Sequence, residues 1–357
     1  MKNRLRSLTI PALTHALLGL SLGALALPAC SGPTVRTSTT PKAKAKAKAK
    51  ITNLRNAALP FKVLVARGGR EISKSALFAK LANVQAICIG ESHPDPHHHW
   101  AQWQLFKALS TQNSKSGVKT ALGMEMFQRP YQGILDDYRG AKISQREMLS
   151  RTAWKKRWGY PYGLYKPMIR LAVKNGHALL ALNTSRELIK KVSRRGLDIM
   201  DPEDKAKLPE LNLTDKQHRA WWRKLMGGMG GGAGHSSPHG HSKHGKKKKK
   251  KPHPSKMSLS ERIYSAQVTW DETMAETASK WLLKGERRQI IILAGNGHCH
   301  ETAIVRRMRR RGIKHVVSIH PIVDTGDGEV GELLAAPVND YVFVMTSDKQ
   351  DGEESGR

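Results

Sequence analysis

The sequence predicts a single α/β domain in which a mostly parallel sheet carries helices on both faces. Short apolar runs alternate with amphipathic stretches of helical period, and this alternation is typical of strand-helix-strand units. Several of the apolar runs also end at a glycine or a polar turn, as strands do at the carboxyl edge of such a sheet. The expected strands are residues 61–66, 84–89, 119–124, 177–182, 289–294, 316–319 and 341–344, within a domain of residues 57–345.

Residues 1–29 have the pattern of a secretion signal. Three basic residues precede an apolar run that is too short and too near the N-terminus for a membrane span. The signal ends at Leu27-Pro-Ala-Cys30, which is similar to a bacterial lipobox, so Cys30 is the expected lipidation site and membrane anchor. A plain signal peptide cut near Ala29 is the alternative. The serine after the cysteine favours an outer-membrane lipoprotein of a bacterial cell envelope, facing the periplasm.

Three further segments lack a core-forming pattern. Residues 30–56 contain a Lys-Ala repeat and are expected to form an extended tether, and residues 346–357 a polar tail. Residues 226–256, rich in Gly, His and Lys, are predicted to be a disordered insertion in the domain. Its histidines suit a loosely bound transition metal, unless the segment is only a solubilising loop. The candidate ligands are His235, His239, His241 and His244.

The formal net charge of +32 lies largely outside the predicted core. Residues 1–50 hold nine Lys or Arg and no acid, and residues 226–256 hold eight Lys and no acid, which leaves +15 for the rest. The sequence also lacks a helix-turn-helix, a zinc finger and the aromatic pattern of RNA-binding sheets. We therefore expect no nucleic-acid partner.

Residues 86–100 place acidic and histidine side chains, which are candidate site residues, at the end of a predicted strand. Gly90 allows a turn, and Glu91 and His93 then lie at the edge where open α/β sheets bind their ligands. The helix that follows carries three consecutive histidines, residues 97–99. Neighbouring helix residues diverge by about 100°, so at most one or two of these histidines belong to the site.

Glu125 ends the next predicted strand much as Glu91 ends the first. Two carboxylates at neighbouring strand ends raise each other's pKa or share a cation. The alternative is structural: Glu125 caps the following helix or pairs with Arg129.

Residues 157–167 hold three of the seven tyrosines of the chain, Tyr160, Tyr162 and Tyr165. Aromatic residues broken by Gly and Pro form a loop with a flat apolar surface and phenol oxygens, which suits a planar ligand. Aromatic packing under a long loop explains the same pattern.

Residues 290–300 form the most apolar strand and a glycine turn that presents His298. Gly295 and Gly297 begin a dinucleotide-binding fingerprint, but its third glycine is missing, so we discard that function. Cys88 and Cys299 lie beside two of these strand ends, and both a disulfide and two small buried side chains are compatible with their positions.

Together these motifs resemble the ChaN family of haem-binding lipoproteins, over about residues 61–312. The family is related more remotely to TraB and Tiki proteins and to erythromycin esterases, in which a Gly-Glu-x-His motif and a later histidine form the active centre. The motifs are Gly90-Glu-Ser-His93 with His97-His98, Glu125-Met-Phe, Trp158 with Tyr165-x-Pro167, Ala181-Leu-Asn183, Trp270-Asp-Glu-Thr-Met-Ala-Glu276 and Ala294-Gly-Asn-Gly-His298.

The resemblance implies an envelope protein that binds haem for iron or haem uptake, with a tyrosine ligand to the iron and the haem held between two subunits. By position, Tyr165 is the favoured iron ligand, with Tyr160 and Tyr162 as the other candidates. His97 or His98 would take the phenol proton, beside Glu91 and His93 in the same haem site.

The second hypothesis, of a different class, is a hydrolase of the Tiki, TraB or erythromycin-esterase type. Its catalytic residues would be Glu91, His93, Glu125 and His298, which would activate water directly or through a divalent metal. The tyrosine-rich loop favours haem, whereas the acid and histidine residues are common to both hypotheses.

Overall fold

The computed structural model describes residues 58–230 and 254–346. In this part of the chain the strands form a single eight-stranded sheet of order β2-β1-β8-β7-β3-β6-β4-β5. The strands are β1 (Phe61–Val65), β2 (Glu71–Ile72), β3 (Ala86–Ile89), β4 (Lys119–Gln128), β5 (Ala178–Asn183), β6 (Arg288–Leu293), β7 (Val316–Asp324) and β8 (Tyr341–Thr346).

The sheet is mostly parallel, as the sequence predicts. Strand β3 pairs in parallel with β6 and β7, β4 with β5 and β6, and β7 with β8. Only β1 runs antiparallel, to β8 on one side and β2 on the other. All seven predicted runs form strands, while β2, which has two residues, is too short to give a periodic signal.

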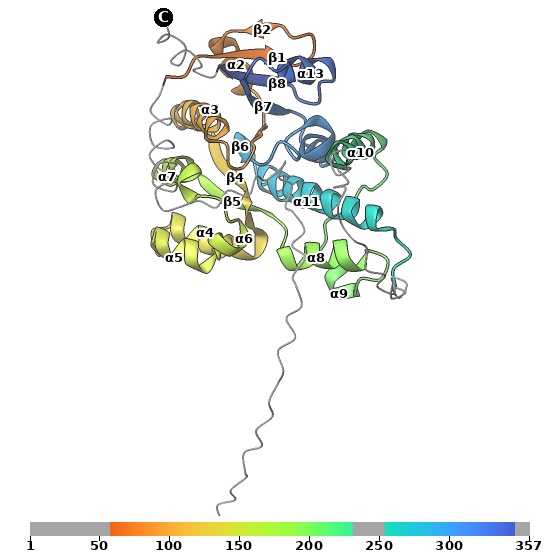
Figure 1. Cartoon of the computed structure of the whole chain (residues 1–357). Helices are drawn as coiled ribbons and strands as arrows, with labels where there is room; N and C mark the ends of the chain where they lie inside the picture. The colour runs from red at the N-terminus through yellow and green to blue at the C-terminus, as the bar shows by residue number, and fades with distance from the viewer. Residues whose placement is uncertain (1–57, 231–253, 347–357) are drawn as a thin grey trace, which may run out of the picture.

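The helices cover both faces of this sheet (Figure 1). Helices α3 and α7 contact β4 on one face, and α11 contacts β5 and β6 on the other. The helices are α2 (Lys74–Leu81), α3 (Pro96–Ser116), α4 (Gln132–Arg139), α5 (Gln145–Arg151), α6 (Trp154–Arg157), α7 (Lys166–Lys174), α8 (Arg186–Arg195), α9 (Pro202–Lys205), α10 (Lys216–Gly230), α11 (Leu259–Leu282), α12 (Arg306–Arg310) and α13 (Glu329–Ala335), with short turns η1 (Arg129–Tyr131), η2 (Tyr162–Leu164) and η3 (Glu301–Val305).

Helix α3 shows how the sequence sets the entry to the site. Asp95 caps the helix by accepting a hydrogen bond from the backbone of His97, and Pro96 occupies the first helical position, where no donor is needed. The helix ends at Gly117, whose positive φ of 70° belongs to the left-handed region that glycine adopts without strain. These two ends fix the start of α3 directly after the loop that follows β3.

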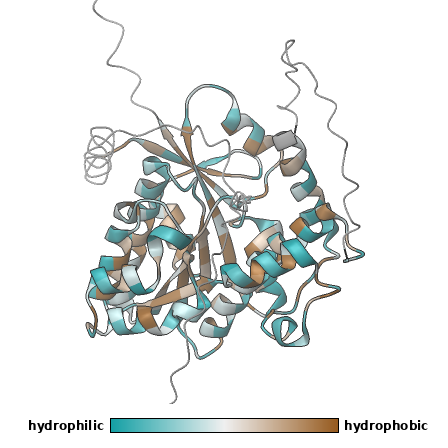
Figure 2. Ribbon diagram, turned by 60° about the horizontal axis from the view of Figure 1, so that its bottom comes forward, coloured by the Kyte–Doolittle hydropathy of each residue, from teal (hydrophilic) through white to brown (hydrophobic). Residues whose placement is uncertain are grey.

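The central strands are buried on both sides, which the hydropathy colouring makes visible as apolar strands between helices with polar outer faces (Figure 2). Alternate residues of β3 therefore enter two cores: Ile87 and Ile89 pack towards α3, while Cys88 packs in the cluster that contains α11 residues. On that second side Cys88 forms a disulfide with Cys299, with 5.3 Å between the Cα atoms. The bond ties the end of β3 to the loop after β6.

The predicted signal (1–29) and tether (30–56) lie outside the described residues, as do most of the insertion and nearly all of the tail. Helix α10 continues to Gly230, so residues 226–230 of the predicted insertion are helical. In the described part of the chain, no helix is long and apolar enough to cross a membrane.

Candidate functional site

Strands β3, β4 and β6 bring Glu91, His93, Glu125 and His298 to one edge of the sheet. The prediction that Glu125 ends its strand is wrong, because β4 continues to Gln128, although its pairing with β6 ends at Met124. Glu91 follows β3, Glu125 lies within β4, and His298 follows β6. They meet around Gly295, where an added Cβ would lie 3.0 Å from His93 Cε1 and 3.7 Å from Glu125 Oε2. The backbone N–H of Gly295 donates to that carboxylate oxygen at 2.7 Å. A glycine is therefore needed at this position for the acid and histidine side chains to converge.

The Glu91 carboxylate is fully enclosed and has a polar partner at every side. Oε1 accepts a hydrogen bond from the Tyr165 hydroxyl at 2.8 Å and lies 2.8 Å from His93 Nδ1. Oε2 accepts from Gln102 Nε2 at 2.8 Å and lies 3.5 Å from His99 Nδ1. Burial raises the pKa of Glu91, but His99, His93 and Tyr165 outweigh it and lower the pKa to about 2. Glu91 is thus ionised at neutral pH.

His93 connects this carboxylate to the aromatic loop. Burial lowers the pKa of His93, but the hydrogen bond to Glu91 and the nearby charge of Glu125 raise it above its usual value. Its ring lies 4.6 Å from the Trp158 ring and 5.1 Å from the Tyr160 ring, between centroids. The loop after α6 therefore covers the histidine side of the centre.

His298 lies between two carboxylates on the other side of the centre. Its Nδ1 is 2.6 Å from Asp271 Oδ1, and its Nε2 is 3.6 Å from Glu125 Oε1. Burial lowers the pKa of His298, yet Glu125 and Asp271 together raise it. Asp271 belongs to α11 and is fully buried. This Asp-His-Glu series holds the imidazole in one orientation, with Nε2 towards the centre.

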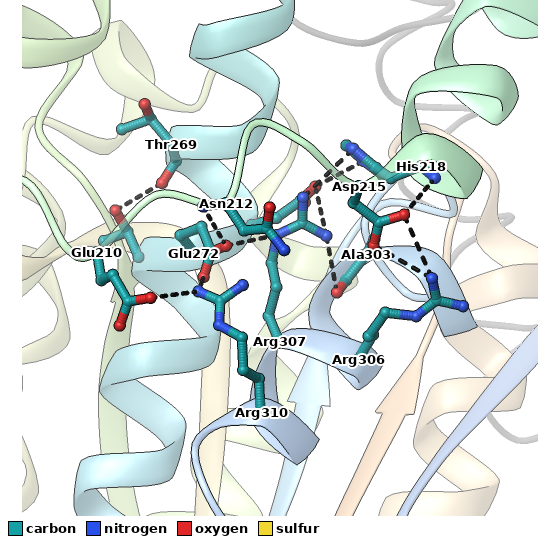
Figure 3. A network of polar contacts seen from close by, with 12 residues as sticks. Glu210, Asn212, Asp215, His218, Thr269, Glu272, Ala303, Arg306, Arg307 and Arg310 are labelled. Atoms are coloured by element: carbon teal, nitrogen blue, oxygen red, sulfur yellow. Dashed lines mark hydrogen bonds and ion pairs between the residues drawn. The ribbon is translucent and has the colours of Figure 1, made fainter.

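A second, cationic group of side chains lies behind Asp271. Asp271 Oδ2 is 3.1 Å from His218 Nε2 and 3.9 Å from Arg307 Nη1. Neither Asp271 Oδ2 nor His218 Nε2 has an aligned hydrogen bond within the described residues. Burial raises the pKa of Asp271, but Arg307, His218 and His298 lower it far below its usual range. His218 comes from α10 and Arg307 from α12, and Figure 3 shows both within one polar network.

The three candidate tyrosines lie in different surroundings. Tyr165 is 0% exposed, and burial, followed by the Glu91 charge, raises its pKa well above the usual value. The Tyr162 hydroxyl is buried without a well-aligned hydrogen bond within the described residues, and burial and Tyr138 raise its pKa as well. Tyr160 is partly exposed. The enclosed position of Tyr165 does not favour its prediction as the iron ligand, because its phenol donates to Glu91 instead.

His97 and His98 contact Asp95 and Ser92 at the start of α3, and their role as proton acceptor for a tyrosine stays a prediction. His98 is buried, and its Nδ1 accepts from the backbone N–H of Ser92 at 2.8 Å, which holds the loop after Glu91 in place. Burial lowers the pKa of His98, consistent with an accepting, neutral ring. His97 Nδ1 lies 3.3 Å from the Asp95 carboxylate at the cap of α3.

The family profile described as "Haem-binding uptake, Tiki superfamily, ChaN" matches residues 77–308. The chain belongs to this family. A solved structure of ChaN from Campylobacter jejuni with cofacially bound haem is 16% identical, with a TM-score of 0.58, over 80% of this chain and 97% of that one. The erythromycin esterase EreC in its open conformation is 10% identical, with a TM-score of 0.40, over 81% and 83% of the two chains. No curated protein matches the chain.

Membership of the ChaN family confirms the predicted resemblance and the α/β fold, while four residues of this centre were not expected from the sequence. Of the three consecutive histidines, His99 is the one that contacts Glu91, because the turn of α3 points its side chain inward. Gln102, one turn later, completes the Glu91 site. Asp271 gives a usable signal, since it lies in the Trp270–Glu276 motif, where two adjacent acids that become buried need partners. His218 gives none.

Among residues 58–230 and 254–346, no group of three or more His, Cys, Asp or Glu side chains is arranged to hold a metal ion. The divalent-metal form of the hydrolase hypothesis therefore finds no support in this part of the chain. The insertion histidines lie outside the described residues, so their metal binding stays a prediction.

Proposed function

We propose that this protein is an envelope lipoprotein that binds haem between two subunits and serves iron or haem uptake. Its membership of the haem-binding ChaN family supports the ligand. The observation that carries the proposal is the aromatic wall of Trp158 and Tyr160 against His93, at the carboxyl edge of the sheet. A flat apolar surface with a phenol at its rim suits a porphyrin and its iron.

The packing beneath the loop decides which face of it the haem would contact. The pocket on the inner side leaves no room even for water, and it is lined by Met126, Phe127, Gln128, Tyr131, Thr152, Trp154 and Arg157. We propose that a porphyrin lies on the outer face of the loop, against Trp158 and Tyr160, with its second side uncovered. Two subunits related by a two-fold axis would cover each other's haem, so we expect haem to drive dimerisation.

Tyr160 is the axial ligand we propose within the predicted set. Ferric haem takes a tyrosine ligand as phenolate. Burial and the Glu91 charge raise the pKa of Tyr165 well above its usual value, whereas Tyr160 lies partly exposed at the surface of the loop. Lys155 and Lys156, both exposed on α6 just before the loop, would pair with the haem propionates.

The anchor and the compartment belong to the same proposal. Cys30 would carry the lipid, and the Cys88–Cys299 disulfide supports an oxidising compartment such as the periplasm. Replacing Cys30 by Ala should move the protein from the membrane to the soluble envelope fraction. Unchanged membrane fractionation would contradict lipidation.

Titration with hemin, followed by visible absorption and sedimentation velocity, tests haem binding. We expect a tyrosinate charge-transfer band and a shift from monomer to dimer in the wild type. Tyr160→Phe should abolish the band while the melting temperature is kept, and Tyr162→Phe serves as the matched control. If Tyr160→Phe keeps the band and Tyr165→Phe loses it, the ligand assignment returns to Tyr165. If hemin gives no spectral change in the wild type, haem binding is wrong.

A second function, hydrolysis without a metal, is favoured by one specific contact. His298 is oriented by Asp271 and faces Glu125, and these two carboxylates raise its pKa, which favours the protonated form that a general acid needs. Release of p-nitrophenol from short p-nitrophenyl esters would measure it. Hydrolysis lost in His298→Asn, with hemin binding unchanged, would support an enzyme. Equal rates in the wild type and in His298→Asn, both at the uncatalysed background, would contradict hydrolysis by this centre.

A further inference from the structure

A cavity of about 240 Å³ lies between α12 and the segment before α10. Figure 3 shows the polar contacts of five of its lining residues, Asn212, Asp215, Arg306, Arg307 and Arg310. Four of its six lining residues are arginines, and the only lining carboxylate is that of Asp215. The lining residues are Asn212, Asp215, Arg306, Arg307, Arg309 and Arg310. The haem site proposed above uses none of them.

Both buried and exposed carboxylates hold these arginines. Glu210, whose side chain is 84% exposed, lies 3.8 Å from Arg310 Nη2. Glu272 is fully buried; its Oε2 accepts from Arg310 Nη2 at 2.9 Å and from Arg311 Nη1 at 2.6 Å, and its Oε1 lies 3.3 Å from Arg307 Nε. Glu301 accepts from Arg309 at 2.6 Å. These contacts fix the guanidinium groups, so their positions are set before any ligand arrives.

Among the lining arginines, Arg310 keeps a donor for a ligand. The other three already donate to protein groups: Arg306 to Asp215 and Gln217, Arg307 to two backbone carbonyls, and Arg309 to Glu301 and a backbone carbonyl. Arg310 binds Glu272 through Nη2, whereas its Nη1 has no partner within the part of the chain that the structure describes. The side chains of Arg306, Arg309 and Arg310 are 35%, 38% and 30% exposed, so an ion can reach them from solvent. The Asn212 side chain adds an amide at the rim.

We propose that this cavity is a binding site for a small phosphate-type oxyanion. Guanidinium groups bind phosphate through paired, charge-assisted hydrogen bonds, and a tetrahedral dianion accepts them from several directions at once. The volume admits a phosphate or a pyrophosphate group. The same chemistry is present in free phosphate compounds and in the headgroups of acidic phospholipids, and the experiment separates these sources.

Calorimetry with pyrophosphate on the full chain, without hemin, tests the site. We expect saturable binding that weakens at least about tenfold in Arg310→Gln, because one charge-assisted hydrogen-bond pair is lost. Arg310→Lys keeps the charge but loses the planar fork, so its affinity for pyrophosphate should lie between those of the wild type and Arg310→Gln. Arg310→Gln should fold, since Arg311 and Arg307 still contact Glu272.

Arg139→Gln is the matched control, because Arg139 is exposed on α4 and its replacement removes the same charge from another surface. Flotation with phosphatidylglycerol vesicles is the second arm. Binding to vesicles that Arg310→Gln weakens, without binding of pyrophosphate, assigns the phosphate to a lipid headgroup. No binding in either arm, or equal losses in Arg139→Gln and Arg310→Gln, overturns the proposal. Hemin binding should be unchanged in all variants, so the two proposals fail separately.

Discussion

Glu91 and Asp271 are two buried carboxylates that the fold stabilises in different ways. Glu91 is surrounded by a phenol, an amide and two imidazoles, each in position for a hydrogen bond or a close polar contact. Asp271 is surrounded by cations or groups that become cations, and its Oδ2 has close partners but no aligned hydrogen bond. Glu91 is thus stabilised by charge together with hydrogen bonds to both oxygens, whereas Asp271 is stabilised mainly by the charge of Arg307 and has a hydrogen bond at Oδ1 alone. The two halves of the centre should therefore respond differently to the same change.

The largest expected effect comes from Asp271→Asn. It removes the anion between His298 and His218, and it leaves the buried Arg307 with Glu272, 3.3 Å away, as its remaining carboxylate. We expect the free energy of unfolding to fall by about 3–5 kcal/mol, the cost of removing one partner of a buried ion pair. Urea denaturation measures it, with the exposed Asp136→Asn as control. A loss below that of Glu91→Gln would mean that charge is not what distinguishes Asp271.

Acid should act on the Glu91 half through linkage. The pKa of Glu91 is lowered from 4.5 to about 2 in the folded protein, so its stabilisation is present above pH 4.5 and is lost as the pH falls to about 2. The loss should amount to about 3 kcal/mol. Unfolding measured between pH 5 and 2 should show the wild type converging on Glu91→Gln. Parallel curves in that range would contradict the lowered pKa.

The smallest expected changes in stability come from replacing the tyrosines Tyr162 and Tyr165 by phenylalanine. Tyr165→Phe removes a donor to an ionised carboxylate and should lower the free energy of unfolding by about 1.5–3 kcal/mol. Tyr162→Phe removes a buried hydroxyl that has no well-aligned hydrogen bond within the described residues and lies near Tyr138, so it should change stability less than Tyr165→Phe does. Thermal melting of both variants gives the comparison. Equal melting temperatures would show that the bond to Glu91 contributes nothing.

The same contrast explains how far the sequence could predict the site. Most of the Glu91 half comes from one strand, one loop and the first turns of α3, so Glu91 and His93 were visible as a local motif. Even there the periodicity limited the histidines but did not identify His99, because one residue of shift rotates a helix face by about 100°. Burial of Tyr165 depends on the packing of α7, which no local pattern reports.

The Asp271 half is assembled from segments far apart in the chain. Asp271, His218 and Arg307 come from α11, α10 and α12, and only the folded chain brings them to His298. The strands were predictable for the opposite reason, since each apolar run carries its own signal. Pair contacts between distant helices leave no such signal in a single sequence.

The disulfide between Cys88 and Cys299 closes a covalent ring with a sequence separation of 211 residues, and residues 231–253 belong to that ring. A protease that cuts once anywhere within the ring yields two fragments that stay joined. One fragment carries Glu91 and Glu125 when the cut falls in residues 231–253, and the other carries His298. The centre thus remains a single covalent molecule after cleavage, and the fragments separate only after reduction.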